Sequence, residues 1–194
     1  SVWSLTEGRR ATVENAKKAA DMGVDMIVLT GNPGVGVDNR AITKALADLN
    51  EAVGDRVILT AGKMHASGIL SEAGEKILTK EDAETFIEAG ADVLLLPAPG
   101  TVPGFTMEHA AELIKTAHEK GVLAMTTIGT SQEGADEETI RQIALMCKMA
   151  GADIHHIGDS GYMGMALPEN ITAYSVAIRG KRHTYRRMAM SLVR

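Results

Sequence analysis

The segment 90–100, Gly-Ala-Asp-Val-Leu-Leu-Leu-Pro-Ala-Pro-Gly, decides the fold that this sequence predicts. Its aliphatic run, Val93 to Leu96, is typical of a strand that is buried on both faces, as strands of parallel sheets are. The strand must end near Pro97, because proline has no amide hydrogen to donate to a neighbouring strand. The segment therefore predicts a buried parallel strand that leads into a loop.

The pattern of this segment is repeated along the chain. Short apolar runs occur at residues 26–29, 57–59, 93–96, 123–125 and 154–157, and each leads to a polar or Gly-rich loop. The phrases 23–25, 90–92 and 151–153 are near copies, Gly-Val-Asp or Gly-Ala-Asp, directly before a run. Helix-length segments with apolar residues at steps of three and four lie between the runs. This rhythm predicts a β-α repeat, with a parallel sheet inside and helices packed outside it.

Helix boundaries can be placed from capping residues. The first two helices are expected over residues 12–23 and 39–52. Thr79 and Asp82 match a capping box, while Thr106 and Asp136 are N-cap residues of helices that run to Lys120 and Ala150. Pro168 is expected to open a terminal helix. The long stretch 66–78 is either a lid over a site or a surface excursion.

Length and composition restrict the function. The chain has 194 residues, of which 45% are hydrophobic and 23% charged, as in one globular domain. The net charge of −5 and the aromatic content of 3% argue against nucleic-acid binding, which uses basic patches and stacked aromatic rings. No apolar run reaches the roughly 20 residues that cross a bilayer, and no secretion signal is recognisable. The single cysteine, Cys147, lies among apolar helical residues and is expected to be buried. We therefore expect a cytoplasmic protein without membrane or nucleic-acid partners.

Over residues 12–180 the layout resembles the later units of a (β/α)-barrel, similar to the phosphate-binding barrel enzymes that include aldolases, isomerases and synthases of phosphorylated metabolites. In that superfamily the last two strand-end loops commonly hold a phosphate through glycine amides. The resemblance implies this role for loops 128–131 and 157–161, with the binding residues Gly129, Thr130, Ser131, Gly158, Ser160 and Gly161.

A weaker likeness concerns the RuBisCO-type barrel, where a Gly-x-Asp-x-x-His-x-Gly phrase borders a phosphate site. Here Gly151, Asp153, His156 and Gly158 fall in register. The lysine and the acidic metal-binding cluster of that family are absent, so its chemistry is not carried over.

Two architectures fit the repeat. A closed barrel needs eight strands and is typically ~250 residues long, whereas this sequence predicts five strands in 194 residues. The favoured interpretation is a single α/β domain, residues 1–194, that forms the C-terminal part of a longer barrel chain, since a fragment and a helix precede the first strand. The alternative is a complete, five-stranded doubly wound sheet.

Candidate catalytic residues follow the predicted strands. Lys63 comes just past the second strand, where a desolvated amine can form a Schiff base with a carbonyl substrate. The alternative for Lys63 is a loop lysine in water or one that pairs with a phosphate. His65 is a candidate proton shuttle. Asp159 follows the fifth strand, where a carboxylate can act as a general base or cap the loop.

His155 and His156 are adjacent on the predicted fifth strand, so their side chains must point to opposite sides of the sheet. We expect one to face the helices as a core residue and choose His156 as the one that meets the substrate. The spacing of His65, His156 and Asp159 does not match a metal-binding motif, and we expect no metal site.

The loop 30–36, Thr-Gly-Asn-Pro-Gly-Val-Gly, can approach a ligand closely through its backbone, with Thr30 and Asn32 as binding residues. It lacks the Gly-Lys-Ser/Thr ending of a Walker loop and the dinucleotide fingerprint. The basic run 179–187 is expected near a helix C-terminus, where cations are stabilising, with an anion contact or a subunit surface as alternatives.

Three functions remain open from the sequence. The first is a TIM-barrel enzyme, an aldolase-like lyase or an isomerase, that acts on a small phosphorylated or carboxylated metabolite. The second is a non-catalytic, barrel-like subunit or sensor that binds such a metabolite. The third is a doubly wound domain that binds a nucleotide or cofactor. Because five strands of a barrel leave open edges, we also expect a homo-oligomer or assembly with further barrel units.

Overall fold

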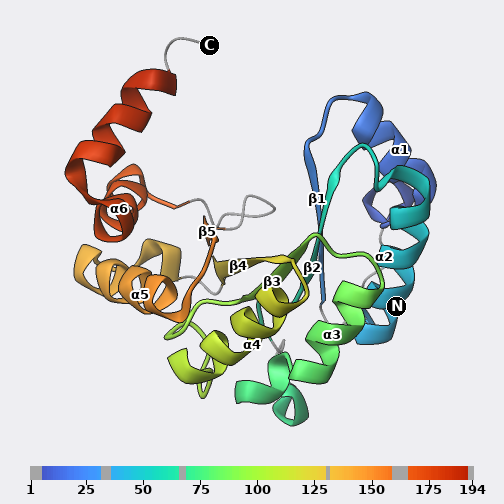
Figure 1. The fold of residues 1–194 in the computed structure, drawn as a ribbon, viewed down its shortest axis with the longest axis horizontal. Helices are drawn as coiled ribbons and strands as arrows, with labels where there is room; N and C mark the ends of the chain where they lie inside the picture. The colour runs from blue at the N-terminus through green and yellow to red at the C-terminus, as the bar shows by residue number, and fades with distance from the viewer. Residues whose placement is uncertain (1–5, 32–35, 66–68, 130–131, 159–165, 192–194) are drawn as a thin grey trace.

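The sheet has five parallel strands in the order of the sequence. The computed structural model describes residues 6–31, 36–65, 69–129, 132–158 and 166–191. The strands are β1 (Met26–Thr30), β2 (Ile58–Gly62), β3 (Val93–Pro97), β4 (Leu123–Ile128) and β5 (Ile154–Ile157), and each pairs with the next. The sheet curls, and the helices form an arc around its outer side (Figure 1). The strand order does not reverse, so the doubly wound alternative is wrong and the partial-barrel prediction is confirmed.

The main helices lie where the capping residues predict them. They are α1 (Val13–Asp21), α2 (Asn39–Val53), α3 (Lys80–Glu88), α4 (Met107–Glu119), α5 (Glu137–Ala150) and α6 (Pro168–Ser191), with short 3-10 helices at η1 (Glu7–Arg9), η3 (Leu70–Glu72), η4 (Gly74–Ile77) and η5 (Gln132–Gly134). The side chains of five N-cap residues each accept a backbone hydrogen bond: Thr12, Asp38, Thr79, Thr106 and Asp136. Within the described segments, no helix has the length and apolarity needed to cross a membrane.

Helix α6 differs from the prediction. It consists of two helical segments that meet at Gly180, whose φ of 78° lies in the left-handed region that glycine tolerates, and the second segment continues to Ser191. Hydroxyl groups connect the two parts of α6, because Ser175 Oγ lies 3.0 Å from the buried Thr184 Oγ1. Arg179 Nε donates a second hydrogen bond to Ser175 Oγ at 2.8 Å. The run 179–187 therefore begins at the end of the first helical segment and continues into the second, so only its first residue lies at the predicted helix C-terminus.

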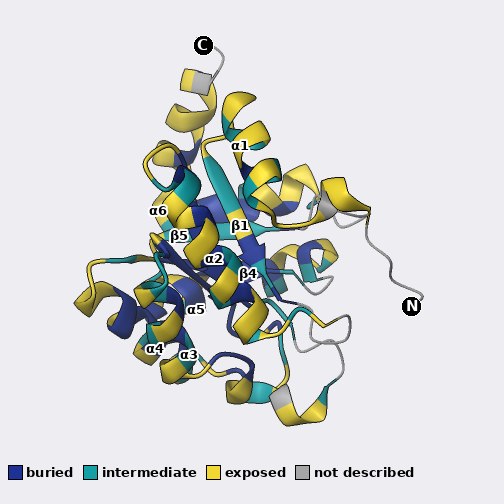
Figure 2. Cartoon of the chain, turned by 90° about the vertical axis from the view of Figure 1, so that its right-hand side faces the viewer, coloured by how far each residue is buried: buried dark blue, intermediate teal, exposed yellow. Residues whose placement is uncertain are grey.

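Apolar side chains are buried on both faces of the sheet. The largest cluster fills the space between the outer face and the helices, and includes Leu59, Phe86 and Leu94. A smaller cluster lies on the inner face around Leu95 and Met125. Burial is deepest at the central strands, while β1 is drawn mainly in the colour of intermediate burial (Figure 2). The inner face is thus partly packed and partly open.

The cysteine is buried as predicted. Cys147 on α5 packs with Ala173 and Tyr174 of α6. Burial disfavours the thiolate and raises the pKa of the Cys147 thiol, although weaker hydrogen bonds with Thr126 and Tyr174 act in the opposite direction. A raised pKa makes this thiol a poor nucleophile.

The repeated Gly-Ala-Asp phrase has a structural role. Asp92 Oδ2 accepts a hydrogen bond from the amide of Leu59 at 2.8 Å. Asp153 Oδ2 accepts one from the amide of Ala124 at 2.8 Å, and it also lies 2.8 Å from His118 Nε2. Each aspartate therefore ties the start of its own strand to the preceding strand.

These ties bear on the RuBisCO-type likeness. Asp153 precedes β5 and Gly158 follows it, so the two residues lie at opposite ends of the strand. Asp153, the aspartate of that phrase, connects β5 to β4 at the amino ends of the strands. In barrels this end of the sheet serves stability and not ligand binding.

Candidate active site

The carboxyl ends of the strands meet at one rim of the sheet, because all strands run in the same direction. Backbone hydrogen bonds join neighbouring loops at this rim: Gly31 donates to Gly62, Ala98 to Thr127 and Gly158 to Ile128. The rim contains the predicted residues Thr30, Lys63, His65, Gly129 and Gly158. The described part of the predicted site thus lies at the end of the fold where barrels carry out their chemistry.

Lys63 is not a loop lysine in water. Only 2% of its surface is exposed, and it is among the largest fully buried side chains. Its stem lies beside Gly31 at the end of β1: a Cβ added to Gly31 would stand 3.4 Å from Lys63 Cγ and 3.0 Å from Ile42 Cδ1 of α2. Burial of this kind is rare for lysine, and it holds the amine within the protein at the rim.

Two glycines bring the loops of β2, β3 and β4 close together. A Cβ on Gly62 would stand 1.8 Å from the carbonyl oxygen of Leu95, so β2 approaches β3 too closely for any side chain. A Cβ on Gly129 would stand 2.9 Å from Met64 Sδ. The loop that carries Lys63 and Met64 therefore contacts the glycine of the predicted phosphate loop after β4.

The two adjacent histidines face opposite sides of the sheet, as predicted. His155 points to the helix layer, where its Nδ1 lies 3.0 Å from the hydroxyl of Tyr174 on α6. His156 shares the alternation of Ile154, which packs on the inner cluster with Val93 and Met125. His156 therefore belongs to the inner face, close to the carboxyl end of β5.

The environment of His155 explains its charge state. Burial lowers the pKa of His155, the negative charge of Asp153 raises it in part, and Arg179 lowers it further. Burial also raises the pKa of Tyr174, so both groups are neutral at neutral pH. His155 is a core residue and does not take part in the candidate site.

Thr30 lies at the rim, and its hydroxyl makes no hydrogen bond with the described residues. Its Oγ1 is buried and has no hydrogen-bond partner in the described part of the chain. Thr30 follows the alternation of Met26, which packs on the inner cluster, so it lies on the inner face. A buried hydroxyl without a partner is costly, which makes Thr30 suited to bind a ligand.

Glu133 is a rim residue that the sequence did not single out. It lies in η5, in the loop after β4, and is 8% exposed; its Oε2 is buried without a hydrogen-bond partner among the described residues. Asn170 of α6 fixes this loop, since its buried amide donates to the carbonyl oxygens of Glu133 and Ala135, each at 2.8 Å. No local pattern indicates this burial, because Asn170 is distant in sequence.

Several predicted residues lie outside the described segments, and the structure therefore does not locate them. They are Asn32, Thr130, Ser131, Asp159, Ser160 and Gly161. His65, although described, is half-buried beside the segment 66–68. The described core of the candidate site consists of Thr30, Lys63, His65, Gly129, His156 and Gly158, with Glu133 added.

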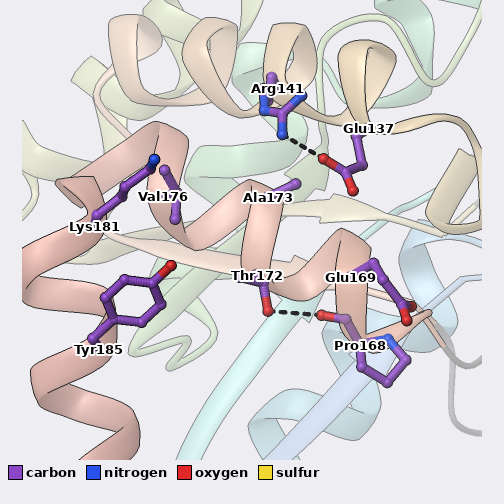
Figure 3. Close-up of a pocket in the computed structure, with 9 residues that line it drawn as sticks. All are labelled: Glu137, Arg141, Pro168, Glu169, Thr172, Ala173, Val176, Lys181 and Tyr185. Carbon is purple, nitrogen blue, oxygen red and sulfur yellow. Dashed lines mark hydrogen bonds and ion pairs between the residues drawn. The ribbon is translucent and has the colours of Figure 1, made fainter.

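A separate cavity of about 410 Å³ lies between α5 and α6 (Figure 3). Lys181 and Tyr185 of the basic run line it from α6, and Arg141 lines it from α5, where it pairs with Glu137. Thr172 closes another side and bonds the carbonyl oxygen of Pro168 at 2.9 Å. The cavity is built from the helix layer and contains none of the rim residues. It is not the candidate active site.

Comparison with known proteins begins with the family. Residues 1–194, the whole chain, match the family described as a domain of unknown function, DUF7916. The chain belongs to this family. A search of curated proteins finds no match.

Solved structures share the fold of this DUF7916 chain. One is a deoxyribose phosphate aldolase from Aeropyrum pernix, with a tetrameric structure, at 21% identity and a TM-score of 0.62; the match covers 88% of this chain and 68% of that chain. A 3-hexulose-6-phosphate synthase matches at 19% identity and a TM-score of 0.57, covering 87% of this chain and 70% of that one. The aldolase QR15 matches at 14% and 0.63, covering 91% and 74%. At these identities the likeness establishes the barrel fold.

Proposed function

We propose that this DUF7916 chain carries the active site of an aldolase-like lyase that acts on a small phosphorylated carbonyl compound. The observation that carries the proposal is the burial of Lys63 at the carboxyl rim of a parallel barrel sheet. Barrel aldolases and a barrel synthase of phosphorylated sugars among the similar structures support the reaction class. An isomerase, the other reaction class considered, would use the same rim residues for proton transfer alone.

The proposed chemistry begins with the amine of Lys63. Its nitrogen adds to the carbonyl carbon of the substrate, and loss of water leaves an imine. The protonated imine accepts the electron pair of the bond between the α and β carbons as that bond breaks, while the hydroxyl on the β carbon loses its proton and that fragment leaves as a carbonyl compound. The remaining enamine takes up a proton at carbon, and water then hydrolyses the imine to release the second product and the free amine. His156 on the inner face, with His65 and Glu133 at the rim, is proposed to carry the protons.

The phosphate is proposed to bind at the loops after β4 and β5. Gly129 supplies a backbone amide, and Gly158, whose own amide donates to the carbonyl oxygen of Ile128, has no side chain that would keep the anion away. Thr30 ends β1 at the opposite edge of the sheet, and its buried hydroxyl, which lacks a partner in the described structure, is proposed to bind another part of the substrate. Assembly into a homo-oligomer belongs to the same proposal, and the exposed Tyr185 and Met190 at the end of α6 support it.

Reduction with borohydride tests the role of Lys63. The full-length protein is incubated with a panel of aldehyde and ketone phosphates, reduced, and analysed by peptide mass spectrometry. We expect a substrate adduct on Lys63, no adduct in Lys63→Met, and an unchanged adduct in Lys44→Met, where the lysine is exposed on α2. Thermal stabilisation by the same compounds without adduct or turnover would favour the metabolite-binding subunit instead.

A further inference from the structure

The inner face of the sheet exposes apolar side chains at its amino-terminal half. Val28, Ile58 and Leu123 are 44%, 43% and 49% exposed. In the same row of the sheet, Val28 pairs with the buried Thr60, and Leu123 pairs with the buried Val93. The row is therefore covered in its middle and open at both ends.

Both edges of the sheet are also open. Within the described segments, β1 pairs only with β2 and β5 only with β4. Every residue of β3 is buried, whereas every residue of β5 has intermediate burial. Figure 1 shows the two edge strands facing a gap that the arc of helices does not enclose. Edges of this kind expose backbone groups that need a partner strand.

The helix layer has matching grooves on both sides of the gap. A cavity of about 450 Å³ is lined by α6 residues such as Ile171 and Met188 and by none from α5, so it faces away from the neighbouring helix. A second cavity, of about 310 Å³, lies where the region of η1 and α1 meets Val28 of β1. Both places are where the adjoining helices of a continued β-α repeat would pack.

We propose that three further β-α units of the same polypeptide cover this face and close an eight-stranded barrel. Parallel barrels of this type close at eight strands, and five are present. A second copy of the chain would bring the total to ten.

The closing units have a defined chemistry. Their strands must be parallel and must place aliphatic side chains against Val28, Ile58 and Leu123. One edge strand must hydrogen-bond to β1 and another to β5. Their carboxyl ends would join the rim that carries Lys63 and His156, so the active site gains a second wall. This inference depends on the sheet alone and holds whatever the chemistry of Lys63.

Cysteine labelling of the full-length protein tests the closure. Val28→Cys and Ile58→Cys place a thiol on the inner face, and Met149→Cys places one on the exposed outer surface of α5. The native Cys147 is buried, so the unsubstituted protein gives the background rate. We expect maleimide to label Cys at position 28 or 58 at least about tenfold more slowly than at position 149, because the closing units protect the inner face.

Two results would overturn the closure. Labelling of Val28→Cys as fast as Met149→Cys in the folded full-length protein would mean that the inner face stays open. Protection that disappears on dilution, together with a change from dimer to monomer in light scattering, would assign the face to a second copy. Neither readout depends on borohydride trapping, so this proposal and the proposed function can fail separately.

Discussion

The hydroxyl of Tyr174 lies 3.0 Å from Nδ1 of His155, and this contact joins β5 to α6 in the buried layer between them. The ring of Tyr174 also stands edge-on to the imidazole, with ring centroids 5.4 Å apart. Because His155 faces α6, the adjacent His156 faces the other side of the sheet, the inner face. The contact between His155 and Tyr174 should contribute to the stability of the protein.

Tyr174→Phe removes the hydroxyl and leaves Nδ1 of the half-buried His155 without this partner. We expect the free energy of unfolding to fall by about 1–3 kcal/mol, measured by urea denaturation. Tyr185→Phe is the matched control, because Tyr185 is exposed, and its stability should not change. Equal stability of Tyr174→Phe and the unsubstituted protein would contradict this account of the contact.

We expect acid to lower the free energy of unfolding over a pH range set by the pKa of His155. Its folded-state pKa lies below the ordinary value of 6.5, so the unfolded chain binds a proton at a pH where the folded protein resists it. Stability is therefore complete above pH 6.5 and declines as the pH falls toward the lowered pKa. Urea midpoints from pH 8 to pH 5, approximate limits that bracket the ordinary pKa of histidine, measure this slope.

His155→Gln should flatten that slope, whatever its effect on stability at pH 8, approximately the upper end of the window. His183→Gln serves as the control for the histidine-to-glutamine change itself, since His183 is exposed on α6. The carboxyl group of Asp153 affects stability in a different pH range from His155. Burial alone would raise its pKa, but hydrogen bonds from His118 and the Ala124 amide lower it, so its contribution is lost only as the pH falls below 3.8.

Asp92→Ala should weaken the sheet without affecting catalysis. The amide of Leu59 loses its side-chain acceptor, and we expect a loss of about 1–3 kcal/mol in the free energy of unfolding. The substitution lies at the amino end of the strands, so under the proposed function kcat should stay the same. Asp55→Ala, at an exposed turn, is the control for the loss of a charge. A fall in kcat would place Asp92 in the active site and refute this division of roles.

Gly62→Ala should prevent correct pairing of β2 and β3. The new methyl group would stand 1.8 Å from the carbonyl oxygen of Leu95, and the backbone must separate to admit it. We expect a loss of at least about 3 kcal/mol and a low soluble yield. In Gly134→Ala nothing lies within 4 Å of the new methyl group, so its thermal midpoint should match that of the original protein. A stable Gly62→Ala protein would disprove the close approach.

Asn170→Ala should loosen the loop that carries Glu133. Two carbonyl oxygens, of Glu133 and Ala135, lose their buried donor. We expect faster hydrogen exchange over residues 132–136 and, under the proposed function, a higher KM. Thr172→Ala, which removes a hydrogen bond confined to α6, should leave this exchange unchanged. Unchanged exchange in Asn170→Ala would mean that the loop is held by other contacts.

Much of the fold was predictable because parallel strands and amphipathic helices have regular sequence patterns. The buried run at Val93 and the capping box at Thr79 each depend on nearby residues. Alternation along β5 likewise separated His155 from His156. Local rules such as these identify the rim and part of the candidate site.

Other features depend on residues that are distant in sequence. Glu133 is buried because Asn170 reaches its loop from α6. The stem of the buried Lys63 lies beside Gly31, which follows another strand of the sheet. The bend at Gly180 does not end α6, because the contact between Ser175 and Thr184 holds the second part in place. No pattern along the chain contains this information.

The aspartate ties at Asp92 and Asp153 precede β3 and β5, every second strand of the sheet. A segment of two β-α units that begins with such an aspartate can therefore accept a hydrogen bond from the strand that precedes it.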